Sequence, residues 1–365
     1  MEITIVGMGQ MGRIYMTNLL NMGFEQDSIV AFDIDPEKVS AAREKFPGLV
    51  IEQDLNLLPV TEAAIVSSNS PSHARVIEEL CARGTKHIFC EKPLGMSVEE
   101  TDYIERAVSQ VGGEVYTAFL INFSPAVAKV LETMVAEDLV LIEGQVTWGK
   151  NRFGDTRPSS GDTEDESVHG AELLRMFAAI NRRIHRETVA GHVSYLDFVD
   201  QAAQDRAHEL DPSFPLRVDS STFATMAMET DAGPVYCSLQ SSFLLGEQVR
   251  TVRILLADRT DPRLPKYAMR FDFDVKRGDE TVDLLQVTDI LAKKNLGEEA
   301  IPANKIRDQL QAFFAAIGGA EADSRLTPFW RARAAVRFTK SIQESHKNGG
   351  VPVPVMTEAD LRLVA

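Results

Sequence analysis

The stretch that decides the fold is ITIVGMGQMG, which runs from Ile3 to Gly12. An apolar run typical of a buried strand leads into three glycines spaced G-x-G-x-x-G, and a helical pattern follows. Here the first glycine permits a tight turn, the second lets the backbone approach a pyrophosphate, and the third allows close helix–strand packing. The helix N-terminus faces the phosphates. The stretch predicts a dinucleotide-binding loop formed by Gly7, Gly9, Gln10, Met11 and Gly12.

A carboxylate follows the next apolar run, SIVAFD, which ends at Asp33, 21 residues after Gly12. At this place an acid accepts hydrogen bonds from the hydroxyls of an adenosine ribose and repels a 2′-phosphate. We therefore expect NAD as the cofactor in preference to NADP. The alternative, a tight turn followed by a helix-capping aspartate, is disfavoured because both features occur in register.

Composition and charge exclude several classes of protein. The 365 residues are 44% hydrophobic, which is enough for two domains with separate cores. The net charge of −16 and the lack of a basic stripe make nucleic acids poor partners. The three cysteines form no C-x-x-C motif, so neither a metal site nor a disulfide framework is expected, and a reducing cytoplasm fits. No apolar stretch approaches the roughly 20 residues of a membrane span, and the N-terminus lacks a basic signal-peptide region.

The first third of the chain alternates short apolar runs with amphipathic segments, which is typical of a doubly wound parallel sheet. Asp35 with Pro36 predicts a helix start, Gly84 predicts a helix end, and SVEE at residues 97–100 predicts a capping box. The expected strands are ITIVG, SIVAFD, LVIEQD, AAIVSS, HIFCEK and EVYTAF.

Beyond about residue 123 the runs become longer and richer in β-forming residues, as in VLIEGQVTWG and STFATMAMET. They predict a large, mostly antiparallel sheet, followed by two late helices within NKIRDQLQAFFAAIGG and PFWRARAAVRFTKSIQESHKNGG. The expected fold class is α/β with a C-terminal α+β domain. We expect a Rossmann domain at 1–122, a substrate-binding and oligomerisation domain at 123–340, and a tail at 341–365 that returns towards the first domain.

The segment HIFCEKPLG, residues 87–95, places Glu91 and Lys92 at the carboxyl end of a predicted strand. In open α/β sheets this edge is where ligands bind. On position alone, a solvated ion pair at a strand end, with Pro93 stopping the strand, is an equally good interpretation.

Three motifs together resemble the Gfo/Idh/MocA oxidoreductase family: the glycine motif, NSPSH at residues 69–73, and EKPLG at residues 91–95. The resemblance implies that Glu91 holds the nicotinamide ribose and that Lys92 reaches the reacting hydroxyl. It further implies cofactor contacts from Ser68, Asn69 and His73. For His73, a satisfied histidine at a helix start is an equally good interpretation.

The candidate for the family's second signature, D-x-x-x-H, is DESVH at residues 165–169. The i, i+4 spacing puts both side chains on one helical face, and a histidine suits a general base near neutral pH. The resemblance implies that His169 is catalytic and that Asp165 orients the substrate or the imidazole. An exposed Asp–His pair is the alternative. The approach SSGDTEDE and the final acid Glu172 depart from the family pattern, so Asp162 remains a second candidate for the family aspartate.

The resemblance implies an NAD-dependent dehydrogenase or reductase acting on CH–OH groups, of the EC 1.1.1 type, with a sugar, amino sugar or cyclitol as substrate. Two alternatives are an NAD-dependent glycoside hydrolase of the same fold and a non-catalytic protein that senses NAD or sugar. Retention of Lys92 and His169 argues against the second. The resemblance also implies a homodimer or homotetramer built through the open face of the second-domain sheet.

The charged stretch before His169 leaves the charge of the substrate open. Lys150, Arg152 and Arg157 would bind a phosphate. The acids of DTEDE would instead bind an ammonium group, which the net charge of −16 also attracts, and we slightly favour an amino sugar or aminocyclitol. A third interpretation is that most of these charges are solvated on a loop. The expected substrate contacts are Lys92, Asn122, Lys150, Arg152, Asp162, Asp165 and His169.

Overall fold

The computed structural model describes residues 1–155, 159–210 and 215–356. The chain divides into two compact units, Met1–Leu120 with Lys305–Val336 and Ile121–Asn304 with Arg337–Ala365. This division differs from the sequence-based one at the C-terminal end. Helix α8 (Lys305–Ile317) belongs to the first unit, whereas strand β16 (Val353–Met356) pairs with β8 (Ile184–Ser194) in the second. The rest of the expected tail, 357–365, lies outside the described residues.

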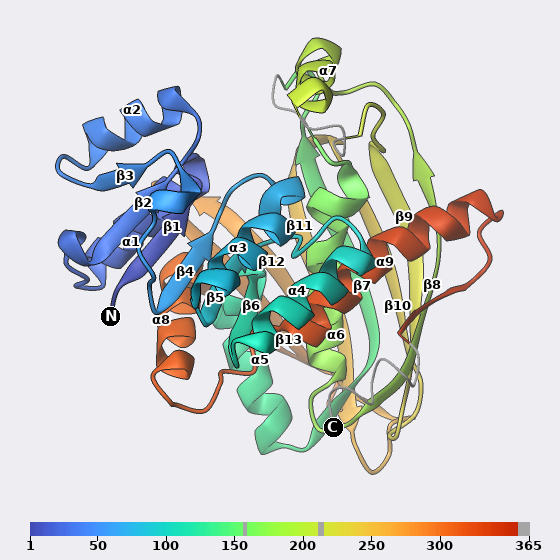
Figure 1. The fold of residues 1–365 in the computed structure, drawn as a ribbon. Coiled ribbons are helices and arrows are strands. Elements are labelled where there is room, and N and C mark those ends of the chain that lie inside the picture. Colours follow the sequence, from blue (N-terminus) through green and yellow to red (C-terminus); the bar gives the residue numbers. More distant parts are fainter. Residues whose placement is uncertain (156–158, 211–214, 357–365) are drawn as a thin grey trace. The chain divides into compact units, whose positions relative to one another are not determined.

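The first unit is built on a seven-stranded sheet of order β15-β6-β5-β4-β1-β2-β3 (Figure 1). Strands β1 to β6 are parallel, and the short β15 (Thr327–Pro328) joins β6 in the antiparallel sense. The order 3-2-1-4-5-6 is that of a doubly wound dinucleotide-binding sheet. All six expected strands are confirmed: β1 (Ile3–Val6), β2 (Ile29–Phe32), β3 (Val50–Glu52), β4 (Ala63–Val66), β5 (His87–Glu91) and β6 (Glu114–Ala118).

The helices of the first unit pack against this sheet through apolar faces. Buried residues of α3 (His73–Arg83) and α4 (Val98–Gln110) form one cluster with residues of β1, β4 and β5. Helix α8 contacts α1 (Gln10–Asn21), and its Phe313 ring lies 5.3 Å from that of Phe89 in β5. Helix α2 (Pro36–Lys45) follows β2. Short helical turns η1 (Gln26–Ser28), η2 (Leu55–Leu57), η3 (Ser70–Ser72) and η4 (Leu120–Phe123) complete the connections.

The predicted helix ends of this unit are confirmed. Asp35 accepts a 2.9 Å hydrogen bond from the Glu37 N–H at the start of α2, and Gly84 ends α3 with a φ of 108°. Ser97 accepts from the Glu100 N–H at 3.2 Å, as a capping box requires. The Glu100 carboxylate bonds the Met96 N–H, one residue before the expected partner.

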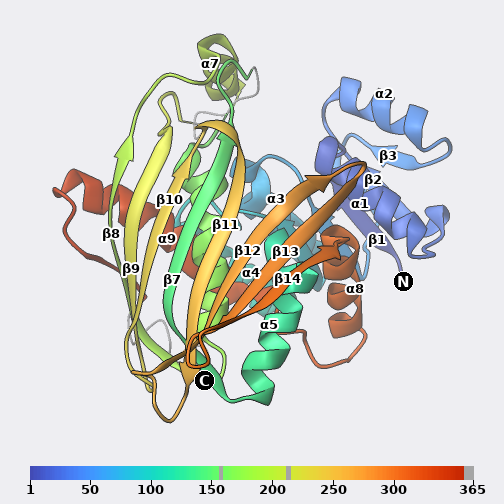
Figure 2. The ribbon, with the colours of Figure 1, turned by 180° about the vertical axis from the view of Figure 1, so that it is seen from behind.

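The second unit is built on a nine-stranded sheet of order β14-β13-β12-β11-β7-β10-β9-β8-β16 (Figure 2). Only the β7–β10 pair is parallel among the described pairings, which confirms the large, mostly antiparallel sheet. The remaining strands are β7 (Leu139–Asn151), β9 (Ser221–Thr230), β10 (Val235–Ser242), β11 (Leu244–Asp258), β12 (Pro265–Arg277), β13 (Glu280–Asp289) and β14 (Lys294–Pro302).

Helices cover one face of the nine-stranded sheet. The nearly fully buried α6 (Val168–Ala178) contacts β7 and β10, and α5 (Pro125–Ala136) contacts β7, β13 and β14. The approach of α6 is close, because a Cβ on Gly170 would lie 2.4 Å from a methyl group of Val146. A π-helical turn, η5 (Thr163–Ser167), leads directly into α6. The late helix α9 (Phe329–Lys347) was expected from the sequence, whereas α7 (Gln201–Leu210) was not.

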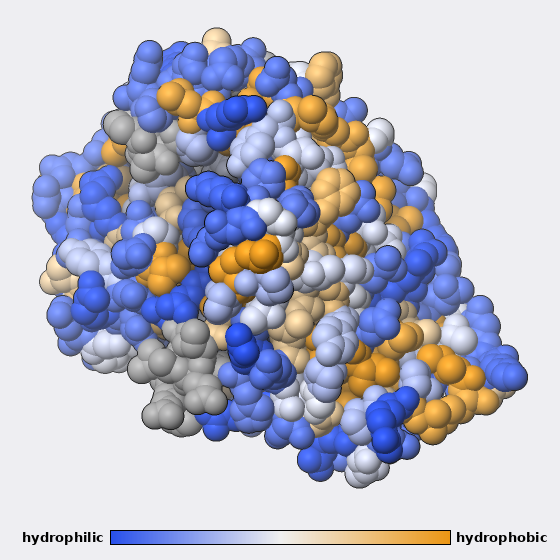
Figure 3. Space-filling model, turned by 90° about the vertical axis from the view of Figure 1, so that its right-hand side faces the viewer, coloured by the Kyte–Doolittle hydropathy of each residue, from blue (hydrophilic) through white to orange (hydrophobic). Residues whose placement is uncertain are grey.

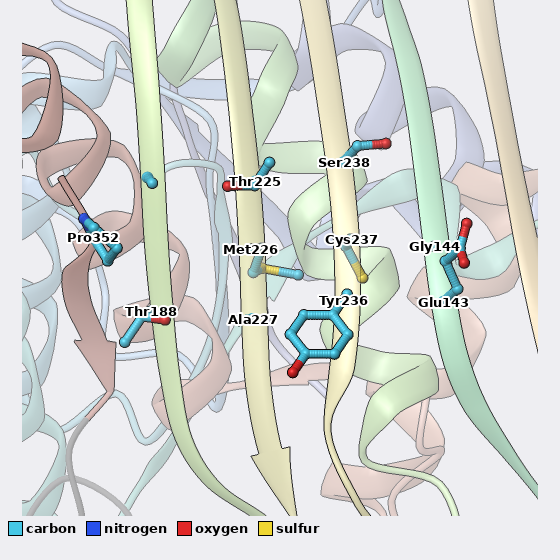
Figure 4. Close-up of a pocket in the computed structure, with 11 residues that line it drawn as sticks. Glu143, Gly144, Thr188, Thr225, Met226, Ala227, Tyr236, Cys237, Ser238 and Pro352 are labelled. Atoms are coloured by element: carbon cyan, nitrogen blue, oxygen red, sulfur yellow. The ribbon is translucent and has the colours of Figure 1, made fainter. Parts of the chain in front are cut away.

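In Figure 2, no helix from the part of the chain that the structure describes covers the opposite face of this sheet. Side chains alternate along the strands, so that Val235, Cys237 and Leu239 are buried while the residues between them point outward. Figure 4 shows part of this open face, where Thr188, Thr225, Ser238 and Tyr236 come from three neighbouring strands. Figure 3, which views the side where β8 and β9 lie, shows apolar and weakly polar side chains gathered between hydrophilic margins.

Candidate active site

The three glycines of the loop in the first unit differ in whether the surrounding protein leaves room for a side chain. A Cβ on Gly7, whose φ is +93°, would lie 2.5 Å from the Ser68 nitrogen, and one on Gly12 would lie 1.8 Å from the Gly7 oxygen. Both glycines are therefore required by the packing of the protein itself. A Cβ on Gly9 would meet no atom within 4 Å. Its backbone thus faces open space, as the approach of a pyrophosphate requires.

Asp33, at the end of β2, is buried and holds the glycine loop. Its Oδ2 accepts a 2.7 Å hydrogen bond from the Met8 N–H, and its Oδ1 accepts one of 2.9 Å from the Asp35 N–H. The carboxylate therefore organises two turns at the carboxyl edge of the sheet. An ionised carboxylate only accepts hydrogen bonds, which suits ribose hydroxyls and disfavours a phosphate.

Glu91 ends β5 and is held from two sides. Tyr15 of α1 donates a 2.5 Å hydrogen bond to Oε1, and the Lys92 N–H donates one of 3.3 Å to Oε2. Burial raises the pKa of Glu91, and burial together with the Glu91 charge raises the pKa of Tyr15 well above its usual range. The Lys92–Pro93 peptide bond is cis. Glu91 is thus a positioned carboxylate rather than a loosely solvated one.

His73 links the loops that follow β4 and β5. It is fully buried, with Nδ1 2.8 Å from the Pro93 oxygen and Nε2 3.1 Å from the Ser68 oxygen. Burial lowers the pKa of its imidazole. These contacts match the interpretation as a satisfied histidine at a helix start, and they also fix the backbone next to Lys92. Ser68 Oγ bonds Ser72 Oγ at 2.7 Å, whereas the side chains of Asn69 and Gln10 are exposed and Met11 is partly buried.

The residues at the carboxyl edge of the seven-stranded sheet fit a dinucleotide cofactor. The start of α1 is capped by Gly9, which has no side chain, so its first N–H groups have no side-chain cap. Such groups bind phosphate oxygens through hydrogen bonds and the helix dipole. Carboxylates stand at two strand ends, Asp33 after β2 and Glu91 at the end of β5. Among the described residues, no group of three His, Cys, Asp or Glu side chains is placed to hold a metal ion.

In the second unit, His169 lies near the start of α6 and stacks on Trp148 of β7. The ring centroids are 5.8 Å apart and the planes differ by 26°. Trp148 is itself fixed, because its Nε1–H donates a 2.9 Å hydrogen bond to Glu166 and its ring lies 6.0 Å from that of Phe273. The imidazole is partly exposed. A partly exposed imidazole held against a rigid ring is a suitable proton acceptor.

Asp165 lies in the π-helical turn rather than in a regular helix, so the α-helical spacing assumed from the sequence does not apply to it. Its Oδ2 accepts a 2.9 Å hydrogen bond from Ser159 Oγ and lies 3.5 Å from Arg152 Nη1. The side chain keeps 25% exposure. Asp165 is therefore a held carboxylate that a ligand can still reach.

Several other charged residues of the stretch before His169 form ion pairs. Lys150 Nζ lies 2.5 Å from Glu166 Oε1, and Arg152 Nε lies 3.1 Å from Asp155 Oδ2. Burial raises the pKa of Glu164, whose carboxylate pairs with Lys340 at 2.5 Å. The interpretation as a solvated charge run is wrong for these groups, since Glu164 and Glu166 are buried. Arg157 lies outside the described residues.

Three other sequence candidates occupy buried positions. Asp162 is fully buried and accepts a 2.5 Å hydrogen bond from Ser241, and burial raises the pKa of its carboxyl well above the usual range. Asn122 is fully buried in η4. Glu172 pairs with Arg175 at 3.2 Å inside the unit. The burial of Asp162 favours Asp165 as the acid that meets a ligand.

Sequence reasoning missed several residues that the structure connects to these groups. Tyr15 has a retrospective signal, because it follows Gly12 by three residues and so lies on the same helical face. Trp148, in the strand run VTWG, is a second aromatic residue that sequence reasoning did not single out. Ser159 and Gln204 have no local signal, because their contacts join segments about 45 residues apart.

Comparison with known proteins agrees with the fold of the two units. The Gfo/Idh/MocA family, described as an oxidoreductase family with an NAD-binding Rossmann fold, matches residues 1–119. A myo-inositol 2-dehydrogenase of Thermotoga maritima is 26% identical over 140 residues, which are 37% of this chain and 40% of that protein. The match therefore spans less than half of the curated relative.

Two solved structures share the fold across nearly the whole chain. A levoglucosan dehydrogenase in complex with NADH has a TM-score of 0.72 and 17% identity, covering 98% of this chain and 99% of that one. GenD2 from gentamicin A biosynthesis, in complex with NAD, has a TM-score of 0.68 and 16% identity, covering 97% and 96%. Residues 1–119 of the chain thus match the Gfo/Idh/MocA family of oxidoreductases, with its NAD-binding Rossmann fold.

Proposed function

We propose that the protein is an NAD-dependent dehydrogenase that exchanges a hydride between nicotinamide and a secondary hydroxyl or ketone of a neutral, hydroxyl-rich ring. The proposal is carried by one prepared group in each unit: Lys92 follows the held Glu91 carboxylate in the first, and His169 stacks on Trp148 in the second. The matching inositol dehydrogenase and the levoglucosan dehydrogenase, as named, act on polyols and sugars. NAD in preference to NADP follows from the Asp33 carboxylate.

The chain's own residues supply proton transfer and charge stabilisation. In the oxidising direction, His169 removes the proton from a secondary hydroxyl, because a neutral imidazole is a competent base near pH 7. The Lys92 ammonium stabilises the negative charge that develops on the same oxygen. The glycine loop, Asp33 and Glu91 would hold NAD, which would supply a hydride acceptor for that carbon. Asp165 accepts a hydrogen bond from a neighbouring hydroxyl and fixes the ring, and ketone reduction uses the same groups in reverse.

The ion pairs support a substrate without charge. Lys150 binds Glu166, whose side chain is only 4% exposed, so a substrate phosphate that took Lys150 would leave a buried carboxylate without its cation. Removing one partner of such a pair is costly. The acids expected to bind an ammonium group are also engaged: Glu164 by Lys340 and Asp165 by Arg152. These pairs weigh against the amino sugar favoured from the sequence, and we propose hydroxyl groups as the ligands.

The experiment is a screen of cyclitols and sugars with NAD, each tested beside its amino and phosphorylated analogue, with the absorbance of reduced nicotinamide as readout. A neutral polyol should give the highest kcat/KM, at least about tenfold above both analogues. A higher value for the phosphate or the amine would refute the statement about charge. Release of free sugar without net NADH would identify a glycoside hydrolase, and NAD binding without any turnover would identify a sensing protein.

We also propose that a second copy of the chain covers the open face of the nine-stranded sheet. Tyr236 is 62% exposed and Phe223 is 46% exposed there, among small side chains such as Thr225 and Ser238. Large exposed aromatics on a flat face are typical of protein interfaces. A face that pairs with itself about a two-fold axis gives a closed dimer.

A further inference from the structure

Helix α7 buries a polar residue where an amphipathic helix normally buries an apolar one. Among its described side chains, Gln204 alone is fully buried, whereas Gln201, Asp205 and Arg206 are exposed. A buried amide is stable only if its donors and acceptor are satisfied. The position of Gln204 therefore points to specific partners.

Those partners are backbone groups of one residue, Ser159. Gln204 Oε1 accepts the Ser159 N–H at 3.0 Å, and Gln204 Nε2 donates to the Ser159 oxygen at 2.9 Å. The same Nε2 donates to the Pro215 oxygen at 2.5 Å. The side chain thus bonds both main-chain polar groups of Ser159, as a neighbouring strand would, and fixes that residue to α7.

Ser159 passes this restraint to the candidate active-site acid. Its hydroxyl accepts the Gly161 N–H at 3.1 Å, so its own proton is directed to Asp165 Oδ2, 2.9 Å away. Arg152 is the second group that holds Asp165, and it packs against residues next to α7. Its guanidinium lies 4.9 Å from the Phe243 ring, which packs with Phe198 just before α7.

We propose that Gln204 is a positioning residue that acts through Ser159 to hold the Asp165 carboxylate, so that α7 is part of the substrate site. This inference rests on the proposed function. It assigns to α7 control of how the hydroxyl-bearing ring is oriented, without contact between Gln204 and the substrate.

The test compares Gln204→Met, which keeps the length of the side chain and removes its hydrogen bonds, with Gln201→Met on the exposed side of the same helix. Gln204→Met and Ser159→Ala should each raise KM for the polyol about tenfold, the usual effect of losing a hydrogen bond to a charged group. Gln201→Met should change KM less than about twofold, and the Kd for NAD should stay constant in all three variants.

A double-mutant cycle separates positioning from a general structural role. In an Asp165→Asn background, Gln204→Met should add less than about a twofold further increase in KM. A full tenfold increase there would overturn the inference, as would an unchanged KM in Ser159→Ala. The Ser159→Ala variant keeps the backbone bonds to Gln204, so it decides the matter if Gln204→Met fails to fold.

Amide hydrogen exchange provides a readout that does not need turnover. In Gln204→Met and Ser159→Ala, peptides covering residues 159–169 should exchange about tenfold faster than in Gln201→Met. Unchanged exchange in both would overturn the inference. If none of the polyols tested supports NAD reduction by the unmutated protein, the proposed function fails. The exchange result still decides whether α7 holds Asp165.

Discussion

Tyr15 on α1 donates a 2.5 Å hydrogen bond to Glu91 at the end of β5, and this bond joins the helix of the glycine loop to the strand end that carries Lys92. Tyr15→Phe keeps the ring that packs edge-on against Phe89 and removes only the donor. We expect the Kd for NAD to rise about tenfold, because Glu91 loses its strongest restraint. Titration of NAD by calorimetry measures this.

The control for that variant is Tyr103→Phe, since Tyr103 donates to Glu78 in an exposed pair of the same chemistry. Its Kd for NAD should not change. An equal affinity of Tyr15→Phe and the unmutated protein for NAD would show that the Tyr15–Glu91 bond does not support the cofactor site.

Cofactor preference tests the role of Asp33. Asp33→Asn keeps an oxygen acceptor for one of the two backbone N–H groups that it binds and removes the negative charge. The ratio of kcat/KM with NAD to that with NADP should fall at least about tenfold, because repulsion of the 2′-phosphate is lost. Asp35→Asn, the same change at the cap of α2, should leave the ratio unaltered. The assignment is wrong if the unmutated protein uses NADP as well as NAD.

His73 should make stability depend on pH in a definite direction. Burial lowers its pKa in the folded state, so the unfolded state binds the proton first as the pH falls through the ordinary value of about 6.5. The free energy of unfolding should therefore decrease below about pH 7, by at most about 1.4 kcal/mol per pH unit from this group. The buried carboxyls with raised pKa values, such as Glu91, contribute with the opposite sign.

Urea unfolding of the unmutated protein and of His73→Gln isolates the His73 contribution to stability. The measurements run from pH 5 to pH 8, a range of about three units around the ordinary histidine pKa. The difference between the two free energies should shrink as the pH falls, because the variant lacks the titrating group. Gln keeps one N–H donor for the Pro93 oxygen. His185→Gln, at an exposed position of β8, serves as control. A difference that is constant with pH would show that His73 does not titrate differently in the two states.

The open sheet face should control association. Tyr236→Lys places a charge on that face (Figure 4), and we expect light scattering to show a shift from dimer or tetramer to monomer. Val135→Lys introduces the same charge at a comparably exposed position of α5, on the covered side of the sheet, and should leave the assembly unchanged. A monomeric unmutated protein would contradict the proposal.

Local patterns in the sequence predicted the fold well where each element has its own signal. Gly7, Asp35 and Gly84 stand at turns and caps whose requirements involve few neighbours, and all three act as predicted. Parallel strands also carry continuous apolar runs, so the first sheet could be assigned strand by strand. The likeness to levoglucosan dehydrogenase extends this fold over nearly the whole chain.

The site was less predictable because its contacts join distant segments. The pairing of Glu164 with Lys340 spans 176 residues, and nothing in DTEDE indicates which acids are engaged in this way. The π-helical turn around Asp165 and the buried amide of Gln204 depend on tertiary packing, which overrides local propensity. For the same reason the sequence left three interpretations open for the charges before His169, and did not show that Glu166 and Glu164 form ion pairs.

The central claim is that Lys92 and His169 perform the chemistry, and the rate of NAD reduction by His169→Ala with a neutral polyol tests it most directly. We predict that kcat falls by about 10²–10⁴-fold, the usual loss for an acid–base group, while the Kd for NAD changes by less than about twofold. Lys92→Ala should lower kcat to a similar extent. Turnover of His169→Ala near the unmutated rate would contradict the account, because the proton would then be removed by another group.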